Sequence, residues 1–156
     1  MPEIGADQRE LFRRWPEGVS VVVAESNGRR AGLTVSSLVS LSLTPPLVGI
    51  SLSIEASLYE VLDEAGEWCV SMLGGDQAQL ARHFARSVPP IALWNDIPVR
   101  DDDPRLLADC VGWIVVRTVD KLRVGDHTIF AGEVVSLELG AAASSLVYLG
   151  REYHAL

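Results

Sequence analysis

Hydroxyl and apolar side chains alternate along an uncharged stretch that runs from residue 32 to residue 53. The apolar positions are Leu33, Val35, Leu41 and Leu43, and hydroxyls stand between them at Thr34, Ser36, Ser40 and Ser42. A period of two predicts strands with one face in the core and one polar face. Two interpretations remain open: a hydroxyl-rich strand at a sheet edge, or a surface that binds a ligand rich in hydrogen-bond acceptors.

Short apolar runs between turn residues predict the other strands. These runs cover residues 19–24, 29–36, 47–52, 68–73, 106–119, 128–139 and 146–149. Asn27-Gly28 separates the first two runs and predicts a tight hairpin, because both residues tolerate positive φ. Many strands, few helices and hairpin turns favour a mainly β protein with an antiparallel, barrel-like sheet. A length of 156 residues fits one domain spanning residues 1–156.

Helical spacing of apolar residues predicts three short helices. One covers residues 7–15 and ends before Pro16, one runs from Ser57 to Gly66, and one follows Asp76. The last two begin with capping-box patterns, in which a serine or aspartate precedes a glutamate or glutamine by three residues. The proline-rich stretch 87–104 is expected to be irregular, either as a lid, a dimer arm or a specificity element, or as a solvated connector.

The composition excludes some classes of function. The formal net charge is −8, which argues against nucleic acid as a partner. An anionic small molecule would need local donors such as backbone amides, hydroxyls or single arginines. Residues 1–7 do not form a secretory signal, and no apolar run approaches the ~18 residues of a membrane span, so we expect a cytoplasmic protein. Cys69 and Cys110 lack metal spacing and are expected to be buried free thiols.

The sequence lacks the usual patterns of protein-based catalysis. His83, His127 and His154 have no spacing typical of metal ligands, and no Gly-x-Ser-x-Gly elbow is present. An enzyme without its own acid–base groups often relies on a cofactor for the chemistry.

A set of motifs, in order along nearly the whole chain, resembles the flavin reductase family, the FMN-binding split-barrel domain of two-component monooxygenases. The motifs are Pro16-Glu17-Gly18-Val19, Gly32-Leu33-Thr34-Val35-Ser36-Ser37, Ser42-Leu43-Thr44-Pro45-Pro46-Leu47, Asp76-Gln77 with Phe84-Ala85, Gly125-Asp126-His127, Gly132-Glu133-Val134 and Tyr153. The resemblance implies an antiparallel split β-barrel that forms a homodimer, with FMN, or alternatively FAD, in the dimer groove.

The resemblance also implies the activity. NADH or NADPH would transfer hydride to the flavin, and the reduced flavin would be released to a partner monooxygenase. The alternative is a flavin-binding electron carrier, or a flavin- or haem-binding split-barrel protein, without its own NAD(P)H reductase activity.

By the same resemblance, the flavin contacts fall on a defined set of residues: Thr34, Val35, Ser36, Ser37, Ser40, Ser51, Ser53, Ser57, Arg86, Ser87, Gly150 and Arg151. Ser57 would meet a phosphate, although a plain helix N-cap explains it equally well. Arg82 and Arg86 are candidate cations, and Arg151 would meet a pyrophosphate. His127 is the catalytic candidate on the nicotinamide side; the alternative is a turn histidine bonded to Asp126.

Overall fold

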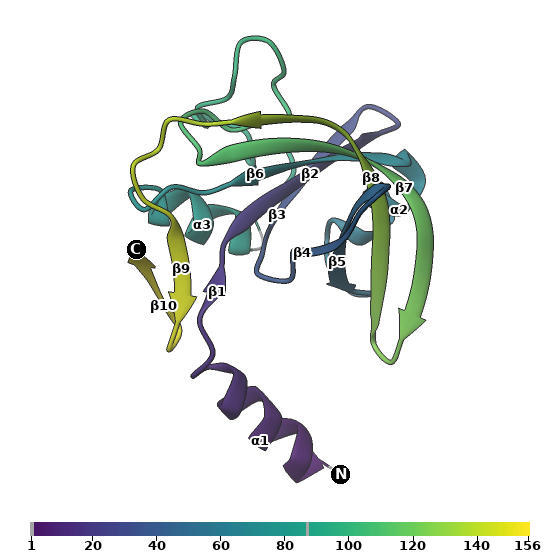
Figure 1. Cartoon of the computed structure of the whole chain (residues 1–156), viewed down its shortest axis with the longest axis vertical. Coiled ribbons are helices and arrows are strands. Elements are labelled where there is room, and N and C mark those ends of the chain that lie inside the picture. Colours follow the sequence, from purple (N-terminus) through teal and green to yellow (C-terminus); the bar gives the residue numbers. More distant parts are fainter. Residues whose placement is uncertain (1, 87) are drawn as a thin grey trace.

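Ten strands and three short helices make up the fold of the computed structural model, which describes residues 2–86 and 88–156 (Figure 1). Seven strands form one large antiparallel sheet in the order β3-β2-β6-β7-β8-β5-β4. Their bounds are β2 Ser20–Ser26, β3 Arg29–Val35, β4 Val39–Leu43, β5 Pro46–Ser53, β6 Glu67–Met72, β7 Gly112–Val124 and β8 His127–Leu139. The expected mainly β, antiparallel architecture is therefore confirmed.

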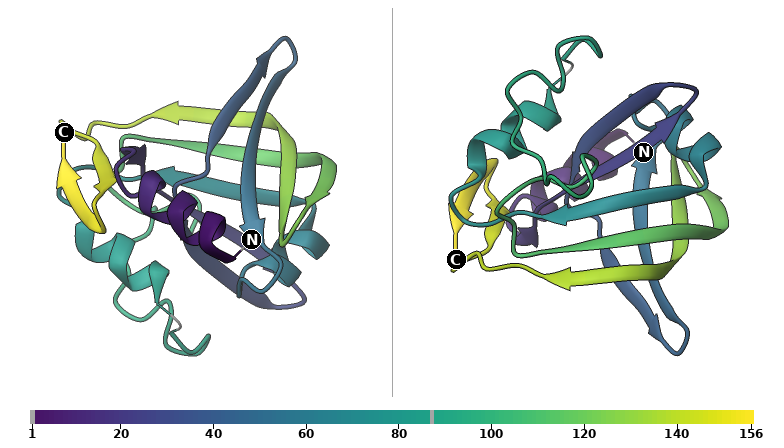
Figure 2. Two further views of the ribbon diagram at one scale, coloured as in Figure 1. Left: turned by 90° about the horizontal axis from the view of Figure 1, so that it is seen from below. Right: turned by 90° about the horizontal axis from the view of Figure 1, so that it is seen from above.

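A smaller sheet and three helices complete the chain. The sheet has the order β1-β9-β10, with β1 at Glu17–Gly18, β9 at Leu146–Leu149 and β10 at Glu152–Ala155. The helices are α1 Pro2–Phe12, α2 Tyr59–Ala65 and α3 Ala78–Ala85. Helix α1 projects from the body of the molecule beneath the large sheet (Figure 2). No helix in the described ranges is long and apolar enough to cross a membrane.

The long strands β7 and β8 bend the large sheet. Their pairing shifts register between Val115 and Val116 and again between Thr118 and Asp120. Gly132 sits at this bend, where an added Cβ would lie 2.2 Å from Val116 Cγ1 and 2.9 Å from the Arg117 carbonyl oxygen. Only glycine fits so close to a neighbouring backbone, which gives the Gly132-Glu133-Val134 motif a structural reason.

Two buried clusters lie on opposite faces of the sheet. One contains Val21, Val23, Ala81 and Phe84 and packs against α3, and the other contains Val22, Ile50, Leu62 and Phe130 and packs against α2. Strand β2 alternates between the two, so both of its faces are buried. Cys69 and Cys110 are free and buried, as expected, and burial raises the pKa of each thiol to about 12.

Asn27 and Gly28 form the expected hairpin turn, with φ values of 52° and 75°. Other boundaries differ from the prediction. Helix α1 covers Pro2–Phe12 rather than 7–15, and β10 was not anticipated. The strand expected over 106–119 begins only at Gly112, because residues 106–111 turn to bury Leu106, Leu107 and Cys110. Asp109 adopts a φ of 61° within this turn.

Neither capping box forms. Helix α2 begins after Leu58 and α3 after Gln77, and neither cap residue makes a side-chain hydrogen bond to its helix. Leu58, and not Ser57, occupies the cap position of α2, and its side chain is fully buried. The Gln77 side chain instead accepts from Gly74 N at 2.8 Å and donates to the Ala108 carbonyl at 2.8 Å. The expected stop at Gly66 is confirmed, with φ 71°.

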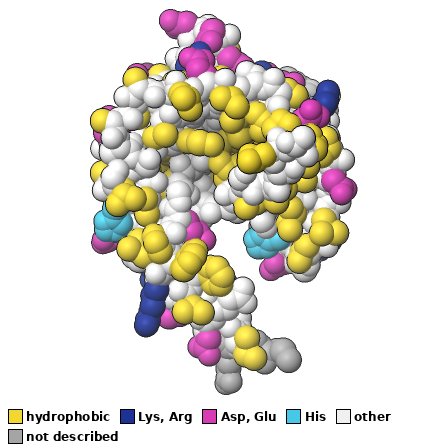
Figure 3. Space-filling view, viewed as in Figure 1, with side chains coloured by type: hydrophobic (Ala, Val, Ile, Leu, Met, Phe, Trp, Pro, Cys, Tyr) yellow, Lys and Arg dark blue, Asp and Glu magenta, His cyan; other side chains and the backbone are white. Residues whose placement is uncertain are grey.

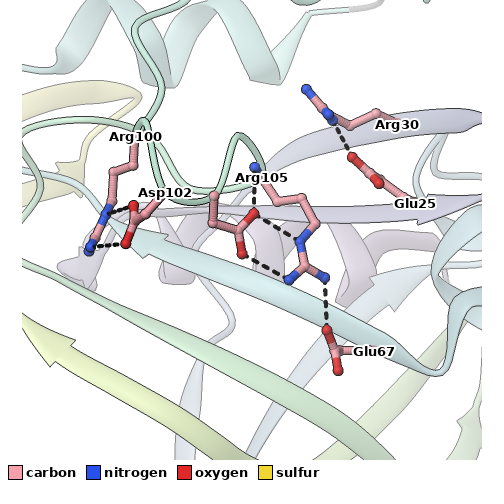
Figure 4. A network of polar contacts seen from close by, with 7 residues as sticks. Glu25, Arg30, Glu67, Arg100, Asp102 and Arg105 are labelled. Carbon is pink, nitrogen blue, oxygen red and sulfur yellow. Dashed lines mark hydrogen bonds and ion pairs between the residues drawn. The ribbon is translucent and has the colours of Figure 1, made fainter.

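Ion pairs fasten the irregular segment 88–111 to the large sheet (Figure 4). Arg105 binds Asp103 through two nitrogens, at 3.0 and 2.8 Å, and reaches Glu67 on β6 at 2.8 Å. Arg100 binds Asp102 and Glu138 at 2.7 Å and lies 4.4 Å from the Trp113 ring centroid. Residues 100–105 therefore form a fixed bridge to the sheet, and earlier in the segment the Trp94 indole is tied to the Arg30 carbonyl of β3.

Replacing Asp103 by asparagine should weaken this bridge. The Arg105 guanidinium holds the pKa of Asp103 below its ordinary value of 3.8. The resulting stabilisation is complete above that value and is lost as the pH falls through the folded-state pKa. We expect Asp103→Asn to lower the free energy of unfolding at pH 7 by about 1–3 kcal/mol, with the deficit shrinking below about pH 4.

Urea denaturation at several pH values measures this effect. Asp101→Asn is the matched control, because Asp101 is exposed and makes no ion pair with the described residues. Equal effects of the two substitutions, or a deficit that does not depend on pH, would contradict the assigned ion pair.

Candidate functional site

Strand β3 is an edge strand of the large sheet, so one side of its backbone has no strand partner. The Trp94 indole Nε1 donates to the Arg30 carbonyl at 3.0 Å, which shows that Arg30 directs its backbone groups toward this open side. Alternate residues of an antiparallel strand point the same way, so Gly32 and Thr34 also face outward. Gly32 is buried beside Phe84 and Trp94, whereas Thr34 is half-buried and Ser36 is exposed. The edge thus opens between Thr34 and Ser36.

The side chains of Thr34 and Val35 make contacts within the protein and are not free to bind a ligand. The Thr34 hydroxyl donates to the Ala81 carbonyl of α3 at 2.7 Å. Val35 is 6% exposed and belongs to the cluster that packs against α2. The hydroxyl–apolar alternation therefore does not leave a free polar face along β3. Of these two residues, only Thr34 keeps backbone groups available to a ligand, because Val35 pairs with Ser20 on β2.

Ser36 and Ser37 line a cavity of about 550 Å³ together with the Pro16–Val19 motif. Two motifs that lie apart in the sequence thus meet at one place. The Ser37 hydroxyl accepts from Ser51 N at 3.1 Å and donates to the Ser51 carbonyl at 3.0 Å. The backbone pairing of β4 with β5 ends at Val39 and Gly49. Beyond that point, the Ser37 side chain replaces the β4 backbone as the hydrogen-bonding partner of β5 at Ser51.

Ser51, Ser53 and His127 stand on one face of the sheet, which we call the serine face. Ser53 pairs with His127 across β5 and β8, and His127 also pairs with Val124 on β7. Directly opposed residues of antiparallel strands project to the same side, and Ser51 lies two residues from Ser53. Ile50 and Leu52, which alternate with the two serines, are buried. The strand pairing therefore places the catalytic candidate next to two of the expected flavin contacts.

The turn before β8 holds the His127 imidazole in place. His127 Nδ1 lies 2.7 Å from Asp126 Oδ1, and this hydrogen bond lowers the pKa of Asp126. A carboxylate can only accept, so Nδ1 carries the proton and Nε2 faces away. The Asp126 carbonyl in turn accepts from Ile54 N at 3.0 Å, which ties the turn to the end of β5.

Ser57 lines a second cavity, of about 800 Å³, at the same open edge of β3; we call it the edge groove. Residues 25–32 of the β2–β3 hairpin form one wall, and Val88, Pro90, Ile91, Leu93 and Trp94 form the other. The Ser57 hydroxyl makes no hydrogen bond to any described residue, so the N-cap alternative does not hold. Ser40 is exposed on β4, away from this groove.

The remaining predicted contacts lie elsewhere or are not described. Arg86 and Arg151 line a separate groove of about 1340 Å³ between α3 and the β9–β10 turn, together with Arg82, whose guanidinium lies 5.6 Å from the Tyr153 ring centroid. Gly150 precedes Arg151 in that turn, and both have positive φ, at 62° and 66°. Ser87 lies outside the described residues. Arg86 and Arg151 thus line this separate groove and not the edge groove.

The sequence reasoning missed three contributors. Trp94 closes the inner part of the β3 edge, and Arg29 and Arg30 line the edge groove. The signal for Trp94 was weak, because a single tryptophan in a proline-rich loop has no periodic pattern around it. The hairpin at Asn27-Gly28 did predict that a strand begins at Arg29. It did not predict that this strand lies at a sheet edge beside a groove.

Residues 12–156 match the family model described as the flavin reductase like domain. A 4-nitrophenol 4-monooxygenase/4-nitrocatechol 2-monooxygenase reductase component of Rhodococcus opacus is 34% identical over 151 residues, covering 96% of this chain and 80% of that protein. An NADH:riboflavin 5′-phosphate oxidoreductase of Streptomyces pristinaespiralis is 32% identical, covering 98% and 89%. The structure of an NADH:FAD oxidoreductase from Streptomyces globisporus superposes with a TM-score of 0.90 at 28% identity, covering 100% and 95%.

Replacing Ser37 by alanine tests the geometry of this site. Alanine removes both hydrogen bonds to the Ser51 backbone and leaves two part-buried polar groups without their partner. We expect a loss of about 1–2 kcal/mol in the free energy of unfolding, measured by urea denaturation. Ser36→Ala, next to it and exposed, should change stability by less than about 0.5 kcal/mol. If the two variants are equally stable, Ser37 does not bridge the strands.

Proposed function

This chain belongs to the flavin reductase family, and on that premise we propose that it is an NAD(P)H:flavin oxidoreductase. It transfers hydride from NADH or NADPH to FMN or FAD and supplies the reduced flavin to a partner monooxygenase. One observation carries the proposal: the open backbone edge at Thr34–Ser36 is followed directly by Ser37, whose hydroxyl is hydrogen-bonded to the backbone of Ser51. Ser51 belongs to the serine face, which also contains His127.

The open edge fits the hydrogen-bonding groups of a flavin. One edge of the isoalloxazine ring alternates carbonyl oxygens with N–H groups, and an unpaired strand offers the complementary alternation of donors and acceptors. The Ser36 hydroxyl is exposed at the same place, and hydroxyls can donate or accept. Ser57 lines the neighbouring edge groove, where a flavin phosphate would lie. When bound, the flavin supplies the hydride-accepting chemistry, and the protein supplies position and hydrogen bonds.

His127 is placed to orient the nicotinamide. Asp126 fixes its Nδ1, so the neutral imidazole presents Nε2 as an acceptor for a carboxamide N–H. When protonated, the same nitrogen becomes a donor that can stabilise negative charge on a reduced ring. The side chain is 46% exposed, so it remains accessible to a second small molecule beside Ser53.

A second copy of this chain completes the site. Apolar side chains share the serine face with His127, and several are exposed: Leu122 by 59% and Val124 by 51% on β7, and Val39 by 47% and Leu41 by 48% on β4. Leu41 lies over Gly49, where an added Cβ would come within 2.9 Å of it. Figure 3 shows hydrophobic side chains around a hollow on one face of the molecule. Exposed apolar surface on this scale marks a protein interface, and a homodimer would bury it next to the bound flavin.

The reductase activity is tested directly by flavin-dependent oxidation of NADH and NADPH. Purified protein should oxidise at least one nicotinamide when FMN or FAD is added, and not otherwise. A protein that retains flavin but accepts electrons from neither nicotinamide would instead be a carrier.

His127→Ala should impair the nicotinamide side selectively. We expect the KM for the nicotinamide to rise about tenfold, as for the loss of one hydrogen bond, while the Kd for flavin stays within about twofold. His154→Ala on β10 is the matched control, since that histidine is exposed and does not lie on β5, β7 or β8. Equal losses in nicotinamide turnover and flavin affinity would contradict the assigned role.

The dimer is tested by placing a charge on the serine face. Leu122→Glu should give a monomer in sedimentation velocity, because an unpaired carboxylate would be buried at the interface. Leu156→Glu, on a residue 85% exposed at the C-terminus, should leave the assembly unchanged. A monomeric wild-type protein that turns over flavin at full rate would overturn the proposed assembly but not the activity.

A further inference from the structure

We propose that the β4–β5 hairpin is an arm that reaches a second copy of this chain and places Leu43 in an apolar pocket at the end of that copy's helix α1. The inference rests on the proposed function, because it names contacts of the proposed dimer and links them to the flavin cavity. The pocket, which we call the α1 pocket, is lined by Leu11, Phe12, Arg14 and Trp15 and has a volume of about 470 Å³.

The described residues of helix α1 are exposed along its whole length. This holds for residues 4–12, and the helix projects from the body of the molecule (Figure 2). A helix of 11 residues is only marginally stable in water by itself, because packing of an apolar face supplies most of the stability of helices in proteins. Yet Leu11 and Phe12 at its end are 66% and 54% exposed. The helix therefore needs a packing surface from another molecule.

The β4–β5 hairpin offers such a surface. It extends beyond the rest of the large sheet (Figure 2), and β4 is the last strand of that sheet. Leu43 at its tip is 85% exposed, and residues 32–53 carry no charge. Exposed edge strands usually carry charged residues that prevent pairing with other chains. An uncharged edge strand with an exposed leucine at its end therefore indicates a segment that another chain covers.

The tip of the arm also complements the basic side chain of the pocket. Pro45 and Pro46 have no N–H group, so the turn after Leu43 presents mainly carbonyl oxygens. Arg14 makes no ion pair with the described residues, and its guanidinium has only donors to offer. An arm in the pocket thus supplies acceptors to Arg14 and an apolar side chain to Leu11 and Phe12.

The area of the interface favours a second copy as the occupant. A specific, stable interface buries about 800 Å² on each partner. The half-exposed valines and leucines of the serine face supply only roughly 200 Å² of apolar area. Phe12 and Trp15 belong to a type of side chain that buries about 150–250 Å² each, so they and the arm supply much of the remainder. In a two-fold dimer each copy contributes one arm and one pocket, so the contact is made twice.

Trp15 connects this contact to the flavin cavity. Besides the α1 pocket, it lines the cavity of about 550 Å³ that contains Ser36 and Ser37. Trp15 is 65% exposed in the single chain. An arm docked in the pocket covers Trp15 and holds it as a wall of the cavity. The partner copy therefore shapes the flavin site, and flavin should bind more tightly to the dimer than to the monomer.

Cysteine cross-linking tests the pairing directly. Leu43→Cys protein is mixed with Leu11→Cys protein, treated with a short bismaleimide, and assayed for cross-linked dimer on a denaturing gel. Cys69 and Cys110 are buried, with thiol pKa values of about 12, so they do not compete. Leu156→Cys replaces Leu11→Cys in the matched control, since Leu156 is also 85% exposed. We expect at least about tenfold more cross-linked dimer with Leu11→Cys.

Leu43→Lys tests the link to flavin binding. It places a second positive charge in an apolar pocket beside Arg14, so we expect a monomer in sedimentation velocity. The Kd for FMN, measured by fluorescence titration, should rise about tenfold because Trp15 loses its cover. Leu156→Lys is the control and should change neither the assembly nor the Kd.

Equal cross-linking in the two mixtures would overturn the pairing. A Leu43→Lys protein that remains a dimer would overturn the arm, and a monomeric one that binds FMN as tightly as the wild type would overturn its link to the flavin cavity. Failure of the proposed function would appear separately, as a wild-type protein that gives the expected cross-link but oxidises neither NADH nor NADPH.

Discussion

The backbone of β3 has a strand partner on one side only, and this constraint governs the rest of the site. An open edge presents unpaired N–H and C=O groups, which proteins normally cover because they invite pairing with another chain. Here Trp94 covers the first part of the edge at Arg30, and Thr34 and Ser36 are left accessible. In the function that we propose, a flavin ring with alternating donors and acceptors would take the place of the missing strand. Flavin binding would then also cover the edge.

Much of the fold could be predicted from local pattern, but the site depends on pairings between distant segments. The hairpin at Asn27-Gly28 and most strands follow from short-range periodicity. The position of β3 at a sheet edge depends on which strands pair with β2, and no local signal reports that. His127 lies next to Ser53 only because β5 pairs with β8, across more than 70 residues. The resemblance to a family supplied these residues as candidates, and the register gives the physical reason why they meet.

Some local expectations failed at the helix starts and along β3. Helix α2 begins after the buried Leu58, so Ser57 does not cap it, and the Gln77 side chain bonds to Gly74 and Ala108 instead of to its own helix. The Thr34 hydroxyl likewise donates a hydrogen bond to the Ala81 carbonyl of α3. The Thr34 hydroxyl is therefore not free for a ligand, and the proposed flavin contact at this residue would be made by its backbone groups. The failed cap has a consequence for function, because it leaves the Ser57 hydroxyl unengaged beside the edge groove.

The distribution of charge also bears on how tightly flavin can be held. The chain carries a net charge of −8, and several of its arginines are neutralised internally: Arg13, Arg30, Arg100, Arg105 and Arg117 all pair with carboxylates. In the proposed site an anionic flavin would therefore meet mainly neutral backbone groups and hydroxyls, with Arg29 exposed at the edge of β3. Neutral hydrogen bonds contribute only about 0.5–1.5 kcal/mol each, so such a site binds without becoming a permanent anchor. A reductase that must release its reduced flavin to another enzyme requires this balance, and the internal pairing of the arginines preserves it.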